Sequence, residues 1–248
     1  MNYICLFTIP QCSLSMNYSP IAADYNKVES ADQTMLLLGY KTMIRFLSPP
    51  ENKEILDYGC GTGIFARELR DQGAKVIGVD VSRGMIDIAK RNASHGILYY
   101  RIHSGDFEQF RDRSFDHAVS NFVFCAIPKK ETIRLILSGI FRVLKENGSF
   151  IMMNSNWEVS NGREFVYHRL NYCENLVSGC RIRVTTKTDP PINFEDYFRS
   201  KMEYQELMEE AGFMTEAIEE PVAPENETFW LDERNYPPYY LIVGRKTS

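Results

Sequence analysis

The sequence predicts an α/β fold in which helices cover both faces of a mostly parallel sheet. Between Glu54 and Met153, short apolar runs of strand length alternate with longer amphipathic runs of helix length. This repeated order of strand and helix is typical of a parallel sheet, because the crossover helices pack back onto its faces. A glycine-rich loop at residues 59–63 joins the first strand to the first helix, where such folds expose main-chain N–H groups to a ligand. The 248 residues, 44% of them hydrophobic, are enough for one domain with a full core.

The core elements follow from these runs in chain order. Strands are expected at Glu54–Tyr58, Lys75–Val79, Leu98–Ile102, Phe115–Asn121 and Ser149–Met153. The helices between them are expected at Ile64–Gln72, Gly84–Asn92 and Lys129–Leu144. The last helix carries its apolar residues on one stripe, as a helix packed on a sheet does: Ile133, Ile136, Leu137, Ile140, Phe141 and Leu144. Two further strands, at Phe213–Glu219 and Tyr239–Arg245, bring the expected sheet to seven.

Helices are also expected on either side of this core. An N-terminal helix at Ala31–Leu47 should end before the prolines at 49 and 50, because proline cannot continue a helix. A C-terminal helix at Lys201–Ala211 should end at Gly212, a residue that favours the helix C-terminus. The expected organisation is a disordered leader (1–16) and a single domain (17–248), made of a helical cap (17–50), a ligand-binding core (51–153), a lid segment (154–198) and a C-terminal helix with strands (199–248).

Composition and charge exclude several classes of protein. The formal net charge of −5 and the pI of about 5.5 argue against a broad surface for nucleic acid, which needs clustered positive charge. The six cysteines are scattered without metal-ligand spacing, so free thiols and no metal site are expected. No apolar run reaches the length of a membrane span, and the first residues do not resemble a signal peptide. The sequence therefore predicts a cytoplasmic protein without a membrane or nucleic-acid partner, and leaves a homo-oligomer open.

The stretch from Asp57 to Gly63 points to the kind of ligand that the loop binds. Its glycines alternate with small residues, so a ligand can approach the main chain closely. A dinucleotide site of the GxGxxG type would need its last glycine where Ile64 stands. The negative carboxylate of Asp57 would also repel a pyrophosphate, whereas it suits a positively charged amine.

Two further acids extend the site along the sheet. Asp80 ends the second strand, where a carboxylate can accept hydrogen bonds from both hydroxyls of a ribose. Asp106 and Phe107 follow the third strand and offer a carboxylate and a flat ring to a nucleobase. The predicted ligand is therefore a nucleoside that carries an amine-bearing tail and no phosphate.

These residues resemble the class I (Rossmann-like) family of S-adenosylmethionine-dependent methyltransferases, in order and spacing over residues 54–153. The resemblance implies a Rossmann-like three-layer sandwich with a mostly parallel seven-stranded sheet, an N-terminal helical cap and a lid insertion after strand five. It also implies S-adenosylmethionine as the cofactor. The segment Tyr18–Asn26 is similar to the first helix of that family, in which the second tyrosine, here Tyr25, folds over the cofactor.

The resemblance implies a role for each residue of the cofactor site. The methionine part would be held by Asp57, Gly59, Cys60, Gly61 and Gly63. The ribose and adenine would be held by Asp80, Val81, Ser82, Met85, Gly105, Asp106 and Phe107. The methionyl amine and the acceptor would meet Asn121 and Phe122, and Tyr25 would fold over the cofactor. Two of these residues have structural alternatives, since Tyr25 could pack within a helix and Phe107 could belong to the core.

The acceptor is expected under the lid segment, which is dense in aromatic side chains that would exclude water from methyl transfer. The predicted substrate pocket consists of Tyr18, Trp157, His168 and Tyr172. His168 is also the weak candidate for a general base, with surface packing as the alternative. A further alternative makes Phe165, Tyr172 and Leu176 the buried stripe of a short helix. Three cations alternate along one stretch and predict the solvent face of a strand or a contact for an anionic acceptor: Arg181, Arg183 and Lys187.

The sequence thus predicts an enzyme that transfers a methyl group from S-adenosylmethionine to a small molecule, in the biosynthesis of a specialised metabolite. One alternative is a methyltransferase that acts on a macromolecule such as tRNA or protein. Another is a non-catalytic, cofactor-binding scaffold on the same fold. The fourth strand ends in Asn121-Phe122-Val123-Phe124 and lacks the (D/N/S)PP(Y/F) motif of enzymes that methylate nucleobase or glutamine amino groups. The sequence alone identifies neither the acceptor nor the atom that is methylated.

Overall fold

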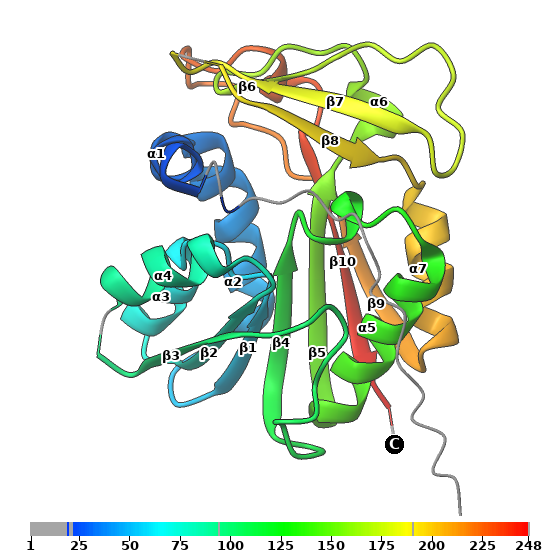
Figure 1. Ribbon diagram of the computed structural model, residues 1–248. Coiled ribbons are helices and arrows are strands. Elements are labelled where there is room, and N and C mark those ends of the chain that lie inside the picture. Colours follow the sequence, from blue (N-terminus) through cyan, green and yellow to red (C-terminus); the bar gives the residue numbers. More distant parts are fainter. Residues whose placement is uncertain (1–18, 20–21, 94, 190, 248) are drawn as a thin grey trace, which may run out of the picture.

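The computed structural model describes residue 19 and residues 22–93, 95–189 and 191–247, and its centre is a seven-stranded sheet (Figure 1). The strand order is β3-β2-β1-β4-β5-β10-β9. The strands are β1 (Glu54–Tyr58), β2 (Lys75–Asp80), β3 (Ile97–Arg101), β4 (Phe115–Asn121), β5 (Leu144–Ser155), β9 (Phe213–Glu219) and β10 (Tyr239–Lys246). The five strands from β3 to β5 pair in parallel, and β10 runs antiparallel to both of its neighbours. The predicted mostly parallel, seven-stranded sheet is therefore confirmed.

Helices cover both faces of this sheet and complete three layers (Figure 1). One face packs against η2 (Met35–Tyr40, a π-helix), α2 (Lys41–Leu47), α3 (Ile64–Asp71) and α4 (Arg83–Arg91). The other face packs against α5 (Lys130–Val143) and α7 (Lys201–Glu210). The apolar stripe of α5 lies where its spacing predicts, since Ile133, Ile136, Leu137 and Ile140 are fully buried.

Most predicted boundaries shift by a residue or two and β5 begins earlier than expected, and two of the differences have a clear local reason. The predicted helix Ala31–Leu47 is interrupted near its start: α1 (Ala22–Ala31) ends, and a new helical stretch follows. Asp32 causes this break, because its carboxylate accepts a hydrogen bond from the N–H of Met35 at 3.0 Å and caps the new start. The helix predicted to reach Leu144 ends at Val143, since β5 begins there and pairs with β4.

The lid segment forms a small three-stranded antiparallel sheet. Its elements are α6 (Trp157–Ser160), β6 (His168–Leu170), β7 (Arg181–Thr186) and β8 (Asn193–Tyr197), with β7 in the middle. The alternative of a buried helical stripe through Tyr172 is wrong, since that region is loop and Tyr172 is 75% exposed. Arg181 and Arg183 are exposed on β7, which confirms the solvent face of a strand for these two, and Lys187 is exposed just beyond the end of β7.

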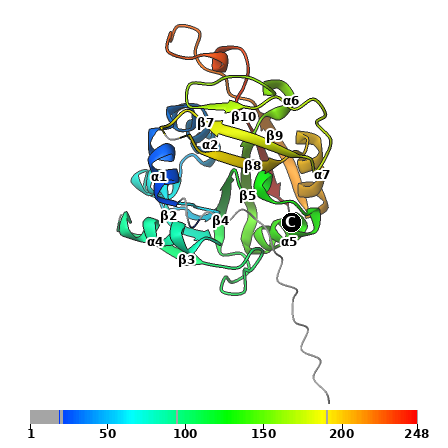
Figure 2. The same cartoon turned by 45° about the horizontal axis from the view of Figure 1, so that its top comes forward.

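The small sheet lies across the end of the large sheet at which β1, β2 and β4 terminate (Figures 1 and 2). It has its own apolar cluster: Trp157, Phe165, Leu170, Ile182, Val184 and Phe198. A short 3-10 helix, η3 (Phe124–Ala126), follows β4 and contacts β8. A second one, η4 (Asp232–Arg234), lies in the loop before β10.

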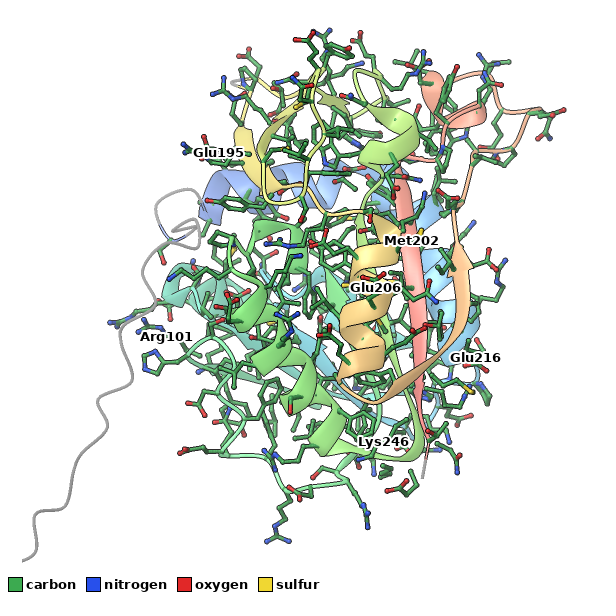
Figure 3. The ribbon with its side chains drawn as sticks, turned by 90° about the vertical axis from the view of Figure 1, so that its right-hand side faces the viewer. Arg101, Glu195, Met202, Glu206, Glu216 and Lys246 are labelled. Carbon is green, nitrogen blue, oxygen red and sulfur yellow. The ribbon has the colours of Figure 1, made fainter. Side chains whose placement is uncertain are left out.

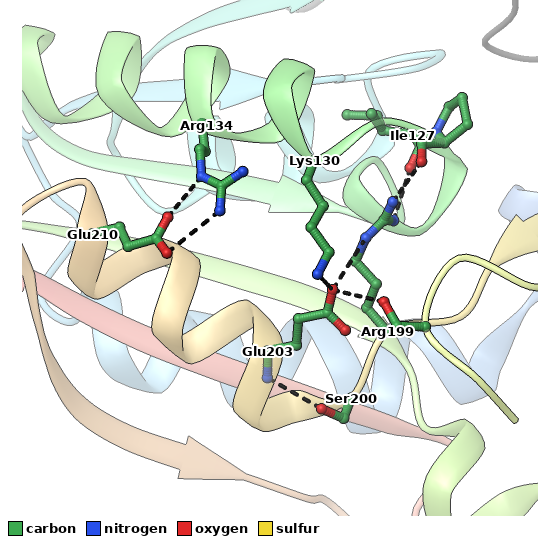
Figure 4. Close-up of polar contacts among 9 residues, drawn as sticks. Ile127, Lys130, Arg134, Arg199, Ser200, Glu203 and Glu210 are labelled. Atoms are coloured by element: carbon green, nitrogen blue, oxygen red, sulfur yellow. Dashed lines mark hydrogen bonds and ion pairs between the residues drawn. The ribbon is translucent and has the colours of Figure 1, made fainter.

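Arg199 fastens the end of the small sheet to the core (Figure 4). Its buried guanidinium donates hydrogen bonds to the carbonyls of Ile127 at 2.8 Å and Pro128 at 2.7 Å. Glu203, in the first turn of α7, forms an ion pair with Lys130 of α5 at 2.7 Å. The junction between the small sheet and α7 is therefore held against the segment that leads into α5. In the part of the chain that the structure describes, no helix is long and apolar enough to cross a membrane.

Candidate active site

A cavity of about 190 Å³ lies between the large sheet and the small sheet. The glycine loop, the end of β2 and the start of α4 supply Tyr58, Gly59, Gly61, Asp80, Val81 and Met85. The segments that follow β3 and β4 supply Ile102, Ser104, Asn121, Phe122, Val123, Ala126 and Ile127. The small sheet supplies His168, Val184, Thr186, Phe194 and Asp196. The remaining wall includes Tyr25, Asp32, Met35, Ser155 and Tyr239. A second hollow of about 30 Å³ shares Gly59, Gly61, Asn121 and Phe122 with this cavity and adds Asp57 and Cys60.

The glycine loop needs its glycines for conformation and for space. Gly59, Gly61 and Gly63 have φ values of 75°, 53° and 80°, a left-handed region that side chains disfavour. A Cβ atom at Gly59 would lie 2.1 Å from Cγ2 of Val123, and one at Gly63 would lie 2.3 Å from the hydroxyl oxygen of Tyr99. Gly59 and Gly61 line the cavity, whereas Gly63 caps the start of α3 behind it. The loop therefore presents bare main chain to a ligand.

Asp80 joins the glycine loop to the start of α4. One carboxylate oxygen accepts a hydrogen bond from the N–H of Gly61 at 3.0 Å, and the other accepts one from the N–H of Ser82 at 2.7 Å. The hydroxyl of Ser82 in turn accepts from the N–H of Met85 at 3.3 Å, so Ser82 shapes the site without lining the cavity. Burial raises the pKa of Asp80. Each oxygen keeps a lone pair for a further donor, as a ribose diol requires.

The smaller hollow fits the amine end of the predicted ligand. Asp57 is 1% exposed and lies in β1 opposite Gly78 of β2. Asn121, at the end of β4, borders both hollows, and its side-chain oxygen has no hydrogen-bond partner among the described residues. A buried carboxylate and a buried amide oxygen are the acceptors that an ammonium group needs. These residues fit the methionine part of S-adenosylmethionine.

The residues after β3 depart from the expectation. Phe107 is 3% exposed and stacks on Tyr58 with ring centroids 5.4 Å apart, so it belongs to the core and not to the cavity wall. The carboxylate of Asp106 accepts a hydrogen bond from the N–H of Glu108 at 3.1 Å and does not line the cavity. Gly105 donates its N–H to the hydroxyl of Tyr58 at 3.1 Å. The alternative of a core role therefore holds for Phe107, and Ile102 and Ser104 line the cavity on this side, while the nucleobase contact of Asp106 stays a prediction.

Only part of the predicted substrate pocket lies at the cavity. His168 does: it is 6% exposed, its ring stacks on Tyr239 with centroids 5.6 Å apart, and its Nε2 has no partner among the described residues. Burial, together with the charge of Lys187, lowers the pKa of His168 to about 3, so the imidazole is neutral. Trp157 is buried in the cluster of the small sheet, away from the cavity, and Tyr172 points into solvent. Both assignments were wrong, because neither side chain lines the cavity: Trp157 is buried behind Asp196, and Tyr172 is 75% exposed. Tyr18 lies outside the described residues.

Tyr25 lies where the resemblance implies. It lines the cavity from α1, and its ring meets that of Phe194 in β8 edge-to-face with centroids 5.4 Å apart. This contact joins the N-terminal helix to the small sheet across the cavity.

Two acids on the cavity wall, Asp196 and Asp32, were not predicted from the sequence. Asp196 is 6% exposed, and burial raises its pKa to about 6, while Cys125 and Trp157, which face the carboxylate, offset part of the shift. Burial also raises the pKa of Asp32 to about 6 against hydrogen bonds from Met35 and Thr34. Asp196 could have been predicted to line the cavity from its position two residues after Phe194, because residues two apart in a strand lie on the same face. Among the described residues, no lysine or arginine lines the cavity, and no cluster of side chains could hold a metal ion.

Known proteins resemble both the sequence and the fold. Residues 56–152 match the family model described as "Methyltransferase domain". N-demethylindolmycin N-methyltransferase of Streptomyces griseus is 27% identical over 91% of this chain and 96% of that protein. Demethylmenaquinone methyltransferase of Tropheryma whipplei (strain Twist) is 30% identical over 77% of this chain and 80% of that protein. The crystal structure of an S-adenosylmethionine dependent methyltransferase from Mesorhizobium loti aligns with a TM-score of 0.62 at 20% identity, over 83% of this chain and 96% of that one. The chain therefore belongs to the class I, Rossmann-like family of S-adenosylmethionine-dependent methyltransferases.

Proposed function

We propose that this methyltransferase acts on a small molecule that binds beneath the small sheet, in the biosynthesis of a specialised metabolite. The observation that carries the proposal is one cavity with two kinds of wall. The wall formed by the ends of β1, β2 and β4 carries the cofactor motif, and the opposite wall is the inner face of the small sheet. A roofed cavity suits an acceptor that enters whole, whereas a macromolecule needs an open surface.

The residues of the chain position the reactants and keep water out. Asp80 and the glycine loop hold the nucleoside, and Asp57 with Asn121 holds the amine end. When bound, S-adenosylmethionine supplies an electrophilic methyl group on a sulfonium. The residues of the chain would orient the acceptor in line with this methyl group and would exclude water, and both effects raise the rate of methyl transfer. Phe194, Val184 and Tyr239 provide apolar walls on the side where the acceptor would lie.

The names of two relatives support a small acceptor. N-demethylindolmycin and demethylmenaquinone are both small molecules, and the relative named for the first aligns over 96% of its own length. The acidic net charge of the chain, −5, argues against tRNA as the acceptor. Intact Asp57, Asp80 and glycine loop argue against a non-catalytic scaffold.

A product screen tests the proposal. The purified chain is incubated with S-adenosylmethionine and pools of small metabolites, and mass spectrometry detects products that have gained one methyl group together with S-adenosylhomocysteine. We expect at least one metabolite to be methylated in a time-dependent way. Transfer of label to tRNA or protein alone would contradict the small-molecule assignment. Cofactor binding without any transfer would support the scaffold alternative.

A further inference from the structure

We infer that the acceptor atom is a nitrogen and that the carboxylate of Asp196 receives its proton. This inference rests on the proposed function, since it names the chemistry of the acceptor that binds beneath the small sheet. Four observations carry it: the position of Asp196, its lack of a cationic partner, the charge of the whole cavity wall and a second polar residue on that wall whose ring nitrogen has no partner among the described residues.

Asp196 reaches the cavity from the inner face of the small sheet. It lies in β8 opposite Ile182 of β7, and Phe194, two residues earlier, lies opposite Val184. Because side chains alternate between the faces of a strand, Phe194 and Asp196 share the inner face while Glu195 between them is exposed. Phe194 and Asp196 both line the cavity.

No cation of the described chain neutralises Asp196. No ion pair of Asp196 occurs within the described ranges, and the groups that face it are the thiol of Cys125, the indole of Trp157 and the phenol of Tyr204. The nearby guanidinium of Arg199 is taken up by the carbonyls of Ile127 and Pro128 and by Glu203. A buried carboxylate without a cationic partner is unfavourable, and a ligand that brings a proton donor or a positive charge relieves this cost.

The charge of the cavity wall selects against an anionic acceptor. Its ionisable side chains include Asp32, Asp80 and Asp196, and no lysine or arginine of the described residues lines it. A phenolate or a carboxylate acceptor would bring a further negative charge beside these carboxylates. Methylation of an amine instead develops positive charge on nitrogen, which the remaining carboxylates of the wall favour once Asp196 has taken up the proton.

A second polar group marks the same space as a binding site. His168 lines the cavity, and its Nε2 is buried and has no hydrogen-bond partner in the described part of the chain. His168 is neutral, so it can hydrogen-bond to a polar ligand without competing with the amine for the carboxylate. Asp32 is less suited to the role of Asp196, because its carboxylate already caps Met35.

The acceptor enters the cavity as an ammonium ion, and one N–H bond breaks as the proton passes to a carboxylate oxygen of Asp196. The lone pair left on nitrogen forms the new bond to the methyl carbon, while the carbon–sulfur bond breaks and its electron pair stays on sulfur. The products are the methylated ammonium ion and S-adenosylhomocysteine, and the proton on Asp196 leaves to solvent.

The test uses the full-length chain and a panel of acceptors in matched sets. Each set shares one aromatic ring system and carries a side-chain amine, a phenol or a carboxylic acid. The variants are Asp196→Asn, which keeps the shape and removes the charge, Asp196→Glu, which restores a carboxylate, and the exposed neighbour Glu195→Gln as control (Figure 3). Far-ultraviolet circular dichroism and S-adenosylhomocysteine affinity establish that each variant is folded and binds the cofactor product.

We expect methylated products from the amines alone, and a loss of about 100-fold in kcat/KM for Asp196→Asn, the size of an acid–base contribution. Asp196→Glu should recover part of this loss, and Glu195→Gln should behave as the wild type. Methylation of a phenol or carboxylic acid by the wild type overturns the nitrogen assignment and leaves the small-molecule function standing. Full amine activity in a folded Asp196→Asn variant overturns the role of Asp196. Failure of every acceptor, with S-adenosylhomocysteine bound, counts against both.

Discussion

Asp80 has two roles at once: its carboxylate fixes the main chain around the cavity, and it lines the cavity where the ligand is expected. Its two oxygens fix the N–H groups of Gly61 and Ser82, at 3.0 Å and 2.7 Å. Gly61 belongs to the glycine loop, and Ser82 caps the start of α4. The side chain of Asp80 therefore fixes two segments at the cavity. Asp80 also lines the cavity, where the ribose is expected.

Replacing Asp80 should weaken cofactor binding. Asp80→Asn keeps the size of the side chain but replaces one acceptor oxygen by a donor, so one ribose hydroxyl loses its partner. A charged hydrogen bond contributes about 1.5–3 kcal/mol, and the dissociation constant of S-adenosylmethionine should therefore rise at least tenfold. Isothermal calorimetry measures this, with the exposed Asp87→Asn in α4 as control. An unchanged affinity in Asp80→Asn would remove this residue from the cofactor site.

Gly59 should not tolerate a side chain. A Cβ atom there would lie 2.1 Å from Cγ2 of Val123, at a φ of 75° that disfavours alanine. Gly59→Ala should lower the free energy of unfolding by about 1–3 kcal/mol, as strained backbone positions and overpacking do. Urea denaturation measures this loss. The double variant Gly59→Ala/Val123→Ala removes the clash and should regain part of it; if it does not, the conformation of the loop and not the contact limits the site.

The local part of the site could be predicted from the sequence, and the part that depends on chain segments far apart could not. The positions of Asp57 and Asp80 at the two hollows could be predicted because each lies at or next to the end of a strand that leads into a recognisable loop. Asp196 was missed because its burial depends on Cys125, Trp157 and Tyr204, which come from three other segments. Phe107 was misplaced because its sequence position leaves open whether the ring turns to the ligand or to Tyr58.

At the scale of elements, the small sheet is a separate packing unit on top of the core. Alternation of residues predicted that Arg181 and Arg183 face solvent, and they do. The pairing of β6, β7 and β8 could not be predicted, because long irregular stretches separate short strands whose register has no local signal. The same uncertainty led to Trp157 and Tyr172 being placed together in the substrate pocket.

Trp157 and Tyr172 should now behave differently when truncated. Trp157→Ala removes a side chain that is 3% exposed from the cluster of the small sheet and should cost about 3–5 kcal/mol of stability there. Tyr172→Ala removes a 75% exposed ring and should change stability by less than about 0.5 kcal/mol. Hydrogen exchange of β7 and β8 amides measures the local effect. The affinity for S-adenosylmethionine should shift by less than about tenfold in both variants, because the large sheet holds the cofactor. Equal protection losses in the two variants would contradict the packing described.

At the scale of the whole molecule, the buried acids make stability depend on pH. The pKa of Asp196 in the folded protein is raised to about 6 from an ordinary value of 3.8. Above pH 6 the carboxylate is ionised in both states, so its burial destabilises the fold in full, by up to about 3 kcal/mol. As the pH falls from 6 towards 3.8, the folded state takes up the proton first, and this destabilisation disappears. His168 acts in the opposite direction below pH 6.5, since its pKa is lowered to about 3.

Asp196→Asn should therefore be more stable than the wild type, and only at neutral and alkaline pH. The difference in the free energy of unfolding should be greatest near pH 8 and shrink towards zero near pH 4. The contribution of His168 is common to both proteins and cancels in this difference. Urea denaturation at several pH values measures it. A difference that grows as the pH falls would show that the carboxylate is stabilised, not destabilised, by its surroundings.

The most direct test of the whole account is a crystal structure of this chain with S-adenosylhomocysteine. We expect the ribose hydroxyls to contact Asp80 and the amine to contact Asp57 or Asn121. We also expect the sulfur to face the part of the cavity beneath the small sheet, with Asp196 and His168 around the space left for the acceptor. A complex in which the ligand fills that space, or in which the sulfur faces away from Asp196, would contradict the division of the cavity on which the proposed function rests.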